Sequence, residues 1–259
     1  MSLLDGKKGL VLNLANDRSI AWHIGRCAIN QGAKVGFGYL PLPRAERRVR
    51  NAMEEGGFGN AWLAPCDVSK DEDIERFFAA ARQEFGEIDF LVHCLAYANR
   101  EYLQMGRFLA TPRDVFAQAM DISAYSLIAL ARAAAPLMPR GGAMVALSYL
   151  GGDRAVPGYN VMGVAKAALE SATRYLAMDL GPKKIRVNVI SAGPMRTLSA
   201  MAVDGIDEAF EHVKHKSPLK RNIEGDEVGM TAVYLVSDLS TGVTGEKVFV
   251  DSGYHMVGI

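Results

Sequence analysis

Two tyrosines and a lysine, Tyr149, Tyr159 and Lys166, are the residues of this sequence best suited to acid–base chemistry on a small molecule. Tyr159 and Lys166 are seven residues apart, which places them two turns apart on one face of a helix. A lysine ammonium at that spacing can lower the pKa of the phenol and can also bind a ribose hydroxyl. A phenol with a pKa of about 10 needs such help to act as a proton donor or oxyanion partner near neutral pH. The spacing is common by chance, so its meaning depends on the elements around it.

Those elements follow the pattern of a β-α repeat, in which short β-branched apolar runs alternate with helix-length segments. We expect strands at residues 9–14, 33–39, 61–65, 88–93, 143–148, 186–190 and 247–250. We expect helices at residues 19–31, 44–54, 71–85, 112–137, 159–180 and 225–237. The strands are apolar along almost their whole length, as in a parallel sheet that is covered on both faces. The sequence therefore predicts a single-domain α/β protein over residues 1–259, with a Rossmann-like doubly wound parallel sheet flanked by helices. After the fifth strand of such a repeat, the tyrosine–lysine spacing becomes a strong signal.

The first β-α turn, residues 12–23, is where a doubly wound fold binds phosphate. It contains no glycine, so the dinucleotide fingerprint is absent. Asn13 can still adopt a positive φ, and Ser19 can cap the next helix while leaving N–H groups free for an anion. A capped helix without any ligand explains this segment equally well.

The ends of the second and third strands leave the choice of cofactor open. The second strand ends at Tyr39 without the Asp or Glu that NAD-specific folds place there. Four arginines follow in the next helix, at Arg44, Arg47, Arg48 and Arg50. They could meet a 2′-phosphate, although a solvated helix face is the more ordinary interpretation. Asp67, after the third strand, could receive an adenine amino group or cap the helix that follows.

Composition narrows the class of protein further. The 29 basic and 29 acidic residues balance, so bulk attraction to nucleic acid or to an anionic membrane is not expected. No apolar run approaches the length of a membrane span and the start does not resemble a signal peptide, so we expect a cytoplasmic protein. Cys27, Cys66 and Cys94 lack a Cys-x-x-Cys spacing, and the five histidines lack a metal-binding spacing. We therefore expect neither a disulfide nor a metal site.

The chain resembles, essentially from end to end, the bacterial enoyl-acyl-carrier-protein reductases, a divergent branch of the short-chain dehydrogenase/reductase family. The segments that carry the resemblance are residues 19–21, 66–68, 121–126, 147–151, 159–166, 191–197 and 244–251. Ala146 stands thirteen residues before Tyr159, where ordinary short-chain dehydrogenases have a catalytic serine that polarises a carbonyl. A pair of tyrosines without that serine suits a different substrate.

The resemblance implies reduction of the trans-2 double bond of an enoyl thioester, carried by acyl carrier protein, in fatty-acid biosynthesis. It implies NADH as cofactor, with NADPH as the other option. Tyr159 would hydrogen-bond the thioester carbonyl and stabilise the enolate, Lys166 would hold the nicotinamide ribose, and Tyr149 would orient the substrate. Ala98 would border the acyl site beside the two tyrosines. The implied cofactor-binding residues are Asn13, Ser19, Ile20, Leu40, Asp67, Val68, Leu95, Lys166, Met195 and Thr197.

The resemblance also implies a mobile substrate-binding lid at about residues 197–214 and a homotetramer, without a nucleic-acid or membrane partner. Four places depart from the family pattern. The family commonly has glycine where Asn13 and His23 stand, a polar residue at Leu40, and Asp-Gly-Gly at residues 251–253. These departures bear on the affinity and choice of the cofactor. Two alternatives stay open: a paralogous reductase of another activated alkene or carbonyl, and a homologue that has lost cofactor binding and catalysis.

Overall fold

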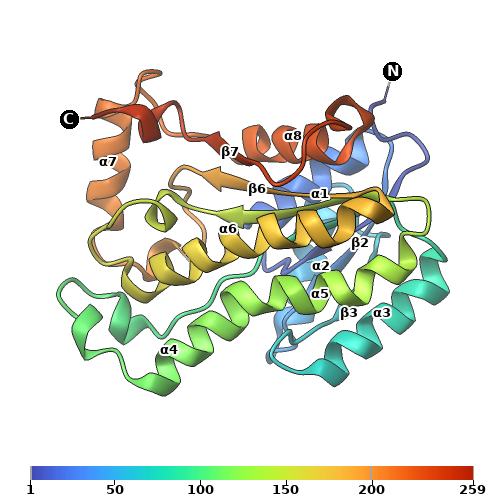
Figure 1. The fold of residues 1–259 in the computed structure, drawn as a ribbon, viewed down its shortest axis with the longest axis horizontal. Helices are drawn as coiled ribbons and strands as arrows, with labels where there is room; N and C mark the ends of the chain where they lie inside the picture. Colours follow the sequence, from blue (N-terminus) through green and yellow to red (C-terminus); the bar gives the residue numbers. More distant parts are fainter. Residues whose placement is uncertain (1, 199, 259) are drawn as a thin grey trace.

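The computed structural model describes residues 2–198 and 200–258, and in this part of the chain seven strands form one sheet (Figure 1). The strands are β1 (Lys8–Leu12), β2 (Lys34–Tyr39), β3 (Trp62–Pro65), β4 (Phe90–His93), β5 (Gly142–Ser148), β6 (Ile185–Ala192) and β7 (Lys247–Val250). Their order is β3-β2-β1-β4-β5-β6-β7, and every neighbouring pair is parallel. The chain reverses its direction of winding between β1 and β4, and ligands bind at such a switch point. The predicted doubly wound sheet is confirmed.

Helices pack on both faces of the sheet because both faces of its strands are apolar. Val11 of β1 belongs to a core with α1 (Ile20–Asn30), α2 (Ala45–Glu55) and α8 (Gly225–Val236). Its neighbours Leu10 and Leu12 belong to a second core with α3 (Asp71–Phe85), α5 (Ser126–Ala134) and α6 (Asn160–Leu180). This alternation buries successive side chains on opposite faces. The all-apolar strands of the sequence are therefore explained by burial on both sides.

The helix expected over residues 112–137 is interrupted. It consists of α4 (Arg113–Met120), a π-helical turn (Asp121–Tyr125), α5 and a short 3₁₀ turn (Ala135–Leu137). In the π-helical turn the hydroxyl of Ser123 donates to the carbonyl of Tyr97 at 3.0 Å and accepts from its N–H at 2.9 Å. The extra residue of the turn thus ties this helix to the segment that follows β4, and such turns are frequent beside functional sites.

The segment after β6 contains more helix than the sequence indicated. A 3₁₀ turn (Ala200–Ala202) is followed by α7 (Ile206–Lys216). Ser199, within the expected lid, lies outside the described residues. The arrowheads of β5, β6 and β7 point toward the end of the molecule that carries α7 (Figure 1). The lid candidate therefore sits at the carboxyl edge of the sheet.

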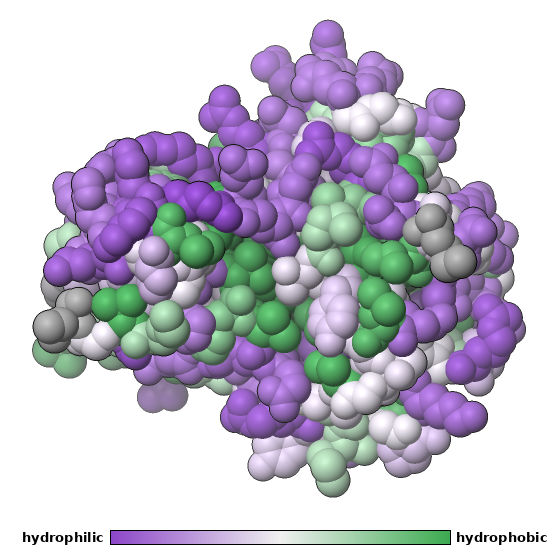
Figure 2. Space-filling view, turned by 90° about the horizontal axis from the view of Figure 1, so that it is seen from above, coloured by the Kyte–Doolittle hydropathy of each residue, from purple (hydrophilic) through white to green (hydrophobic). Residues whose placement is uncertain are grey.

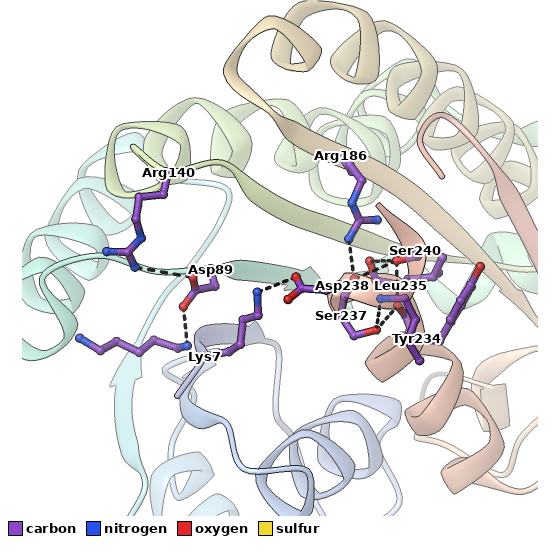
Figure 3. A network of polar contacts seen from close by, with 11 residues as sticks. Lys7, Asp89, Arg140, Arg186, Tyr234, Leu235, Ser237, Asp238 and Ser240 are labelled. Carbon is purple, nitrogen blue, oxygen red and sulfur yellow. Dashed lines mark hydrogen bonds and ion pairs between the residues drawn. The ribbon is translucent and has the colours of Figure 1, made fainter. Parts of the chain in front are cut away.

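The opposite, amino edge of the sheet is covered by ion pairs and backbone hydrogen bonds (Figure 3). Lys7 pairs with Asp238 at 2.8 Å. Asp89 accepts from the backbone N–H of Lys8 at 2.8 Å and lies 3.7 Å from Arg140. Arg186 donates to the carbonyl of Ser237 at 3.2 Å. These contacts join the starts of β1, β4 and β6 to the loops around them.

Candidate active site

A cavity of about 350 Å³ opens at the carboxyl edge of the sheet, between the ends of β1, β4, β5 and β6 and the segment that leads into α7. This volume is in the range of small-molecule binding sites. Ten of the predicted site residues line it: Asn13, Ser19, Ile20, Leu95, Ala98, Tyr149, Tyr159, Lys166, Met195 and Thr197. Residues that follow four strands, together with residues of α1 and α6, are thus brought to one place from distant parts of the sequence.

Three predicted cofactor residues, Leu40, Asp67 and Val68, do not line this cavity. Leu40 follows β2 and is 40% exposed. Asp67 accepts hydrogen bonds from the backbone and hydroxyl of Ser69, at 3.1 and 2.7 Å, and so closes the turn after β3. The N-cap of α3 is Lys70, so the alternative that Asp67 caps this helix is wrong.

The two tyrosines face each other in the cavity. Their ring centroids are 4.9 Å apart and the rings are inclined by 64°. Tyr149 directly follows β5, and Tyr159 is the N-cap residue of α6. Burial raises the pKa of Tyr149 to about 12, and burial, with smaller contributions from Tyr149 and Glu170, raises the pKa of Tyr159 as well. The expectation that Lys166 lowers the pKa of the Tyr159 phenol is wrong for this arrangement. Tyr159 therefore carries its proton near neutral pH and can donate a hydrogen bond.

Lys166 lies beneath the cavity and is 4% exposed. Its Nζ donates to the carbonyl of Leu147 at 2.7 Å and to that of Leu95 at 3.3 Å, so it joins the ends of β5 and β4. Burial lowers the pKa of Lys166 to about 8. An ammonium has three donors, so one N–H is left for a ligand. A ribose hydroxyl fits this requirement.

The first turn is shaped for an anion, although not by the side chain that the sequence suggested. Asn13 has a φ of 71°, as predicted, and its amide donates to the carbonyl of Cys94 at 2.9 Å. Ser19 occupies the N-cap of α1, but its hydroxyl donates to the carbonyl of Asn16 at 2.6 Å and does not cap the helix. The first turn of α1 also has no acidic residue. The N-terminus of α1 thus offers uncapped N–H groups to a phosphate.

Two of the departures from the family pattern occupy positions where glycine is favoured. Asn13 and Ser252 both take positive φ, 71° and 58°, which costs a residue with a Cβ more than it costs glycine. A third departure, His23, faces α8. Its Nδ1 lies 2.8 Å from Asp226 of α8, and a Cβ on Gly225 would come within 2.2 Å of its ring. Gly225 therefore makes room for His23.

Sequence reasoning missed the role of Ser148 and Glu170. Ser148 lines the cavity, but its hydroxyl donates to the carboxylate of Glu170 at 2.5 Å. It also missed Val203 and Ile206, which line the cavity from the lid candidate. The apolar spacing of Ile206, Phe210 and Val213 is a helical signal that could have placed α7.

The structure also describes the three cysteines and shows whether any group of residues could bind a metal ion. All three cysteines are free, and burial raises the pKa of Cys94, which lines the cavity, to about 12. Cys94 is therefore a thiol and not a ready nucleophile. Within residues 2–198 and 200–258, no group of three or more histidine, cysteine, aspartate or glutamate residues could hold a metal ion.

The switch-point cavity, the uncapped helix N-terminus and the tyrosine–lysine face of α6 together define a nicotinamide-dependent oxidoreductase of the short-chain dehydrogenase class. The family model described as enoyl-(acyl carrier protein) reductase matches residues 14–255, and the chain belongs to this family.

Enoyl-acyl-carrier-protein reductases are similar to this chain over almost its whole length. An enoyl-acyl-carrier-protein reductase of Nostoc, named for NADH, is 49% identical over 99% of both chains. One of Staphylococcus aureus, named for NADPH, is 47% identical over 98% of both. The crystal structure of the Bacillus cereus enzyme with NADP⁺ and an indole naphthyridinone superposes with a TM-score of 0.96 at 49% identity, covering 100% of both chains.

Proposed function

We propose that this chain reduces the trans-2 double bond of an enoyl thioester on acyl carrier protein, with a nicotinamide dinucleotide as hydride donor, in fatty-acid synthesis. The observation that carries the proposal is the placement of Tyr159 against Tyr149 in the cavity, with the buried Lys166 two turns further along the same helix. These groups match the needs of a conjugate reduction, in which negative charge collects on the thioester oxygen.

The catalytic roles follow from this placement. The bound nicotinamide supplies a hydride to the β-carbon of the substrate. Tyr159 donates a hydrogen bond to the thioester oxygen, onto which the double-bond electrons move, and stabilises the enolate. Tyr149 lies against Tyr159 and orients the thioester, while Ala98 borders the acyl chain. A proton then reaches the α-carbon and completes the saturated thioester.

The cavity residues from Lys166 to the first turn would hold the dinucleotide. Lys166 would donate its remaining N–H to the nicotinamide ribose. Leu95, Met195 and Thr197 would serve the nicotinamide side, and Asn13, Ser19 and Ile20, at the N-terminus of α1, would serve the pyrophosphate. The adenosine end continues toward three residues outside the cavity lining: Leu40, Asp67 and Val68.

The arginines of α2 support acceptance of NADPH as well as NADH. Arg44, Arg47 and Arg48 line a shallow groove with Asn16 and Asp17 of the first turn. Arg48 donates through Nε to the carbonyl of Ala15 at 3.0 Å, which fixes its guanidinium beside this turn. Arg50 instead pairs with Glu46 at 2.8 Å. Leu40, and not an Asp or Glu, directly follows Tyr39 at the end of β2.

The lid is proposed at residues 197–214 of a single-domain chain. Its described contacts with the rest of the molecule are both apolar and polar: Val203 packs against the cluster that contains Ala98 and Leu103, and Phe210 and Val213 are buried. Asp204 donates its backbone N–H to the carbonyl of Leu103 at 3.1 Å, and Arg196 pairs with Asp207 at 2.9 Å. Opening of this segment would admit the acyl chain to the cavity that Val203 and Ile206 line.

A homotetramer is supported by two separate groups of exposed apolar side chains, since a tetramer of dihedral symmetry needs two self-complementary faces. One group, on the helices of one sheet face, contains Phe116, Tyr125, Ile128, Val164, Tyr175 and Met178. The other, near β7 and α8, contains Leu219, Met230, Tyr234 and Met256. Figure 2 shows apolar side chains gathered in the middle of the latter face, with hydrophilic ones around them.

A cytoplasmic location is supported by the three free cysteines, which suit a reducing compartment. Among the described residues, none of the helices could cross a membrane. The balanced formal charge of the chain favours neither nucleic acid nor an anionic lipid surface as a partner.

The test is oxidation of NADH and of NADPH with a short trans-2-enoyl thioester, offered on acyl carrier protein and on coenzyme A. We expect oxidation that depends on the thioester, and the faster dinucleotide and carrier are then the preferred ones. Turnover of ketones without turnover of enoyl thioesters would instead identify a paralogous carbonyl reductase. Failure to bind either dinucleotide would identify a homologue without catalysis.

A further inference from the structure

Residues 149–154, the first part of the segment between β5 and α6, lie directly on α6 and include Tyr149. Two glycines permit this contact. A Cβ on Gly151 would lie 2.3 Å from the ring of Tyr159, and one on Gly152 would lie 2.8 Å from Oε1 of Glu170. We call residues 149–154 the tyrosine loop. Its position against α6 determines where Tyr149 stands relative to Tyr159.

A buried carboxylate holds both ends of the tyrosine loop. Glu170 is on α6, one turn after Lys166, and is 6% exposed. Its Oε1 accepts from the hydroxyl of Ser148 at 2.5 Å, and its Oε2 pairs with Nζ of Lys247 at 2.8 Å. Lys247 also pairs with Asp153, near the far end of the loop. One network therefore connects β5, α6, β7 and both ends of the loop.

The burial of this carboxylate needs a reason. A charge taken out of water is costly unless it is paired and hydrogen-bonded, and an apolar residue at position 170 would fill the same space without that cost. The reaction proposed above gives Glu170 no contact with substrate or cofactor. What the carboxylate does supply is an acceptor on each of two sides, one toward Ser148 and one toward Lys247.

We infer that Glu170, paired with Lys247, is a positioning residue that fixes the tyrosine loop and so holds Tyr149 against Tyr159 in the geometry that the enoyl thioester requires. This inference rests on the proposed function. Release of the loop displaces Tyr149 from the thioester, and misplacement by about 1 Å can cost on the order of 10²-fold in rate. Dinucleotide binding through Lys166 and the first turn does not depend on the loop.

Two variants release the loop in different ways. Glu170→Gln keeps the size and an acceptor for Ser148 but loses the charge that pairs with Lys247. Lys247→Met removes the ammonium from the edge strand β7 and leaves the bond between Ser148 and Glu170 in place. In both we expect kcat/KM for the enoyl thioester to fall about tenfold or more, through kcat and KM together. The Kd for NADH should be unchanged in Lys247→Met, which keeps the carboxylate whose charge counteracts the lowering of the Lys166 pKa by burial. Lys247→Arg keeps the charge and should restore most of the activity.

The matched control is Thr173→Val on the same buried face of α6. Thr173 donates its hydroxyl to the carbonyl of Leu169 at 3.0 Å, within the same helix. Its replacement should leave kcat and KM unchanged even if thermal stability falls. Loss of stability alone therefore does not reproduce the expected result.

The result that would overturn the inference is wild-type kcat and KM in folded Lys247→Met, or a loss that appears equally in the Kd for NADH. If Glu170→Gln does not fold, Lys247→Met decides the question, because Lys247 lies on β7, the outermost strand of the sheet, where a substitution disturbs the core less. Tyr159→Phe separates the inference from the proposed function. If that variant keeps its turnover, the proposed function fails; if it loses turnover while Lys247→Met does not, only the positioning role fails.

Discussion

The two edges of the sheet use charged and polar residues in opposite ways. At the amino edge, Lys7 pairs with Asp238 and Arg140 lies 3.7 Å from Asp89 (Figure 3), and the side chains of Asp238 and Arg140 are 81% and 69% exposed. At the carboxyl edge, Lys166 is buried and donates to the carbonyls of Leu147 and Leu95. The Lys7–Asp238 pair and Arg140 at the amino edge are solvated, whereas water barely reaches the ammonium of Lys166 at the carboxyl edge.

This difference shows how one sheet separates stability from function. Exposed ion pairs contribute little to folding and perturb their partners little, because water screens them. A buried ammonium is costly to the fold, and burial moves its pKa into the range where a small change in conditions changes its charge. The buried ammonium at the carboxyl edge therefore lowers the stability of the fold, but it is a group whose charge can respond to a ligand.

Loss of the Tyr159 hydroxyl is the strongest test of this contrast. In Tyr159→Phe we expect kcat/KM for the enoyl thioester to fall on the order of 10²-fold or more, because the hydrogen bond to the enolate is lost. The thermal unfolding midpoint should change little, since the ring still packs against Tyr149. Steady-state kinetics and a melting curve on the same sample measure both. Unchanged turnover would show that the carboxyl edge does not act through this phenol.

Replacement of Lys166 should have the next largest effect, and it should act on dinucleotide binding. Lys166→Met should weaken NADH binding by about 10- to 100-fold, the effect of one hydrogen bond from a charged donor. Stability should change little, because relief of the buried charge is offset by two carbonyls left without a donor. Titration of the variant with NADH, alongside chemical denaturation, gives the two values. If stability falls steeply and NADH affinity does not, Lys166 is a structural residue like those of the amino edge.

Several features of this edge could be predicted from the sequence because each depends on local spacing. Tyr159 and Lys166 lie on the same helix face whenever α6 forms. The positive φ of Asn13 follows from its position directly after β1. The apolar strands likewise required burial on both faces. These inferences needed only the repeat of elements along the chain.

Other features depend on contacts between distant residues and left no local signal. Glu170 lies in an apolar helix like any lone glutamate, and its partner Lys247 is 77 residues away. The hydroxyl of Ser148 turns to Glu170 only because the glycines of the tyrosine loop let it lie on α6. His23 faces α8 and not a strand because Gly225 leaves room there.

The pH dependence of NADH binding sharpens the comparison further. Burial lowers the pKa of Lys166 from its ordinary value of 10.5 to about 8. As pH rises through about 8, the ammonium loses the proton that serves the ribose, so NADH affinity should fall by up to about tenfold per pH unit. The same pKa shift affects stability in the opposite direction. Between about pH 8 and pH 10.5 the unfolded chain binds more protons at this lysine than the folded chain, so Lys166 makes the stability of the fold rise with pH.

Calorimetric titration with NADH at several pH values measures the first effect, and Lys166→Met is the control. Its NADH affinity should be weak and should vary little across the same range. A decline of equal steepness in wild type and variant would assign the titration to another group.

The smallest expected effect is at the amino edge and tests whether the contrast holds there. Lys7→Met removes the ion pair with Asp238, whose carboxylate is mostly in solvent, so the free energy of unfolding should fall by only about 0–1 kcal/mol. This difference should shrink in high salt, which screens an exposed pair, and kcat, KM and the Kd for NADH should match wild type. Lys247→Met, on the outermost strand β7, is the matched variant, since it removes a lysine whose partner Glu170 is buried. If Lys7→Met impaired turnover as much as Lys247→Met, the amino edge would also position the catalytic groups, and burial of the partner would not be what separates the two edges.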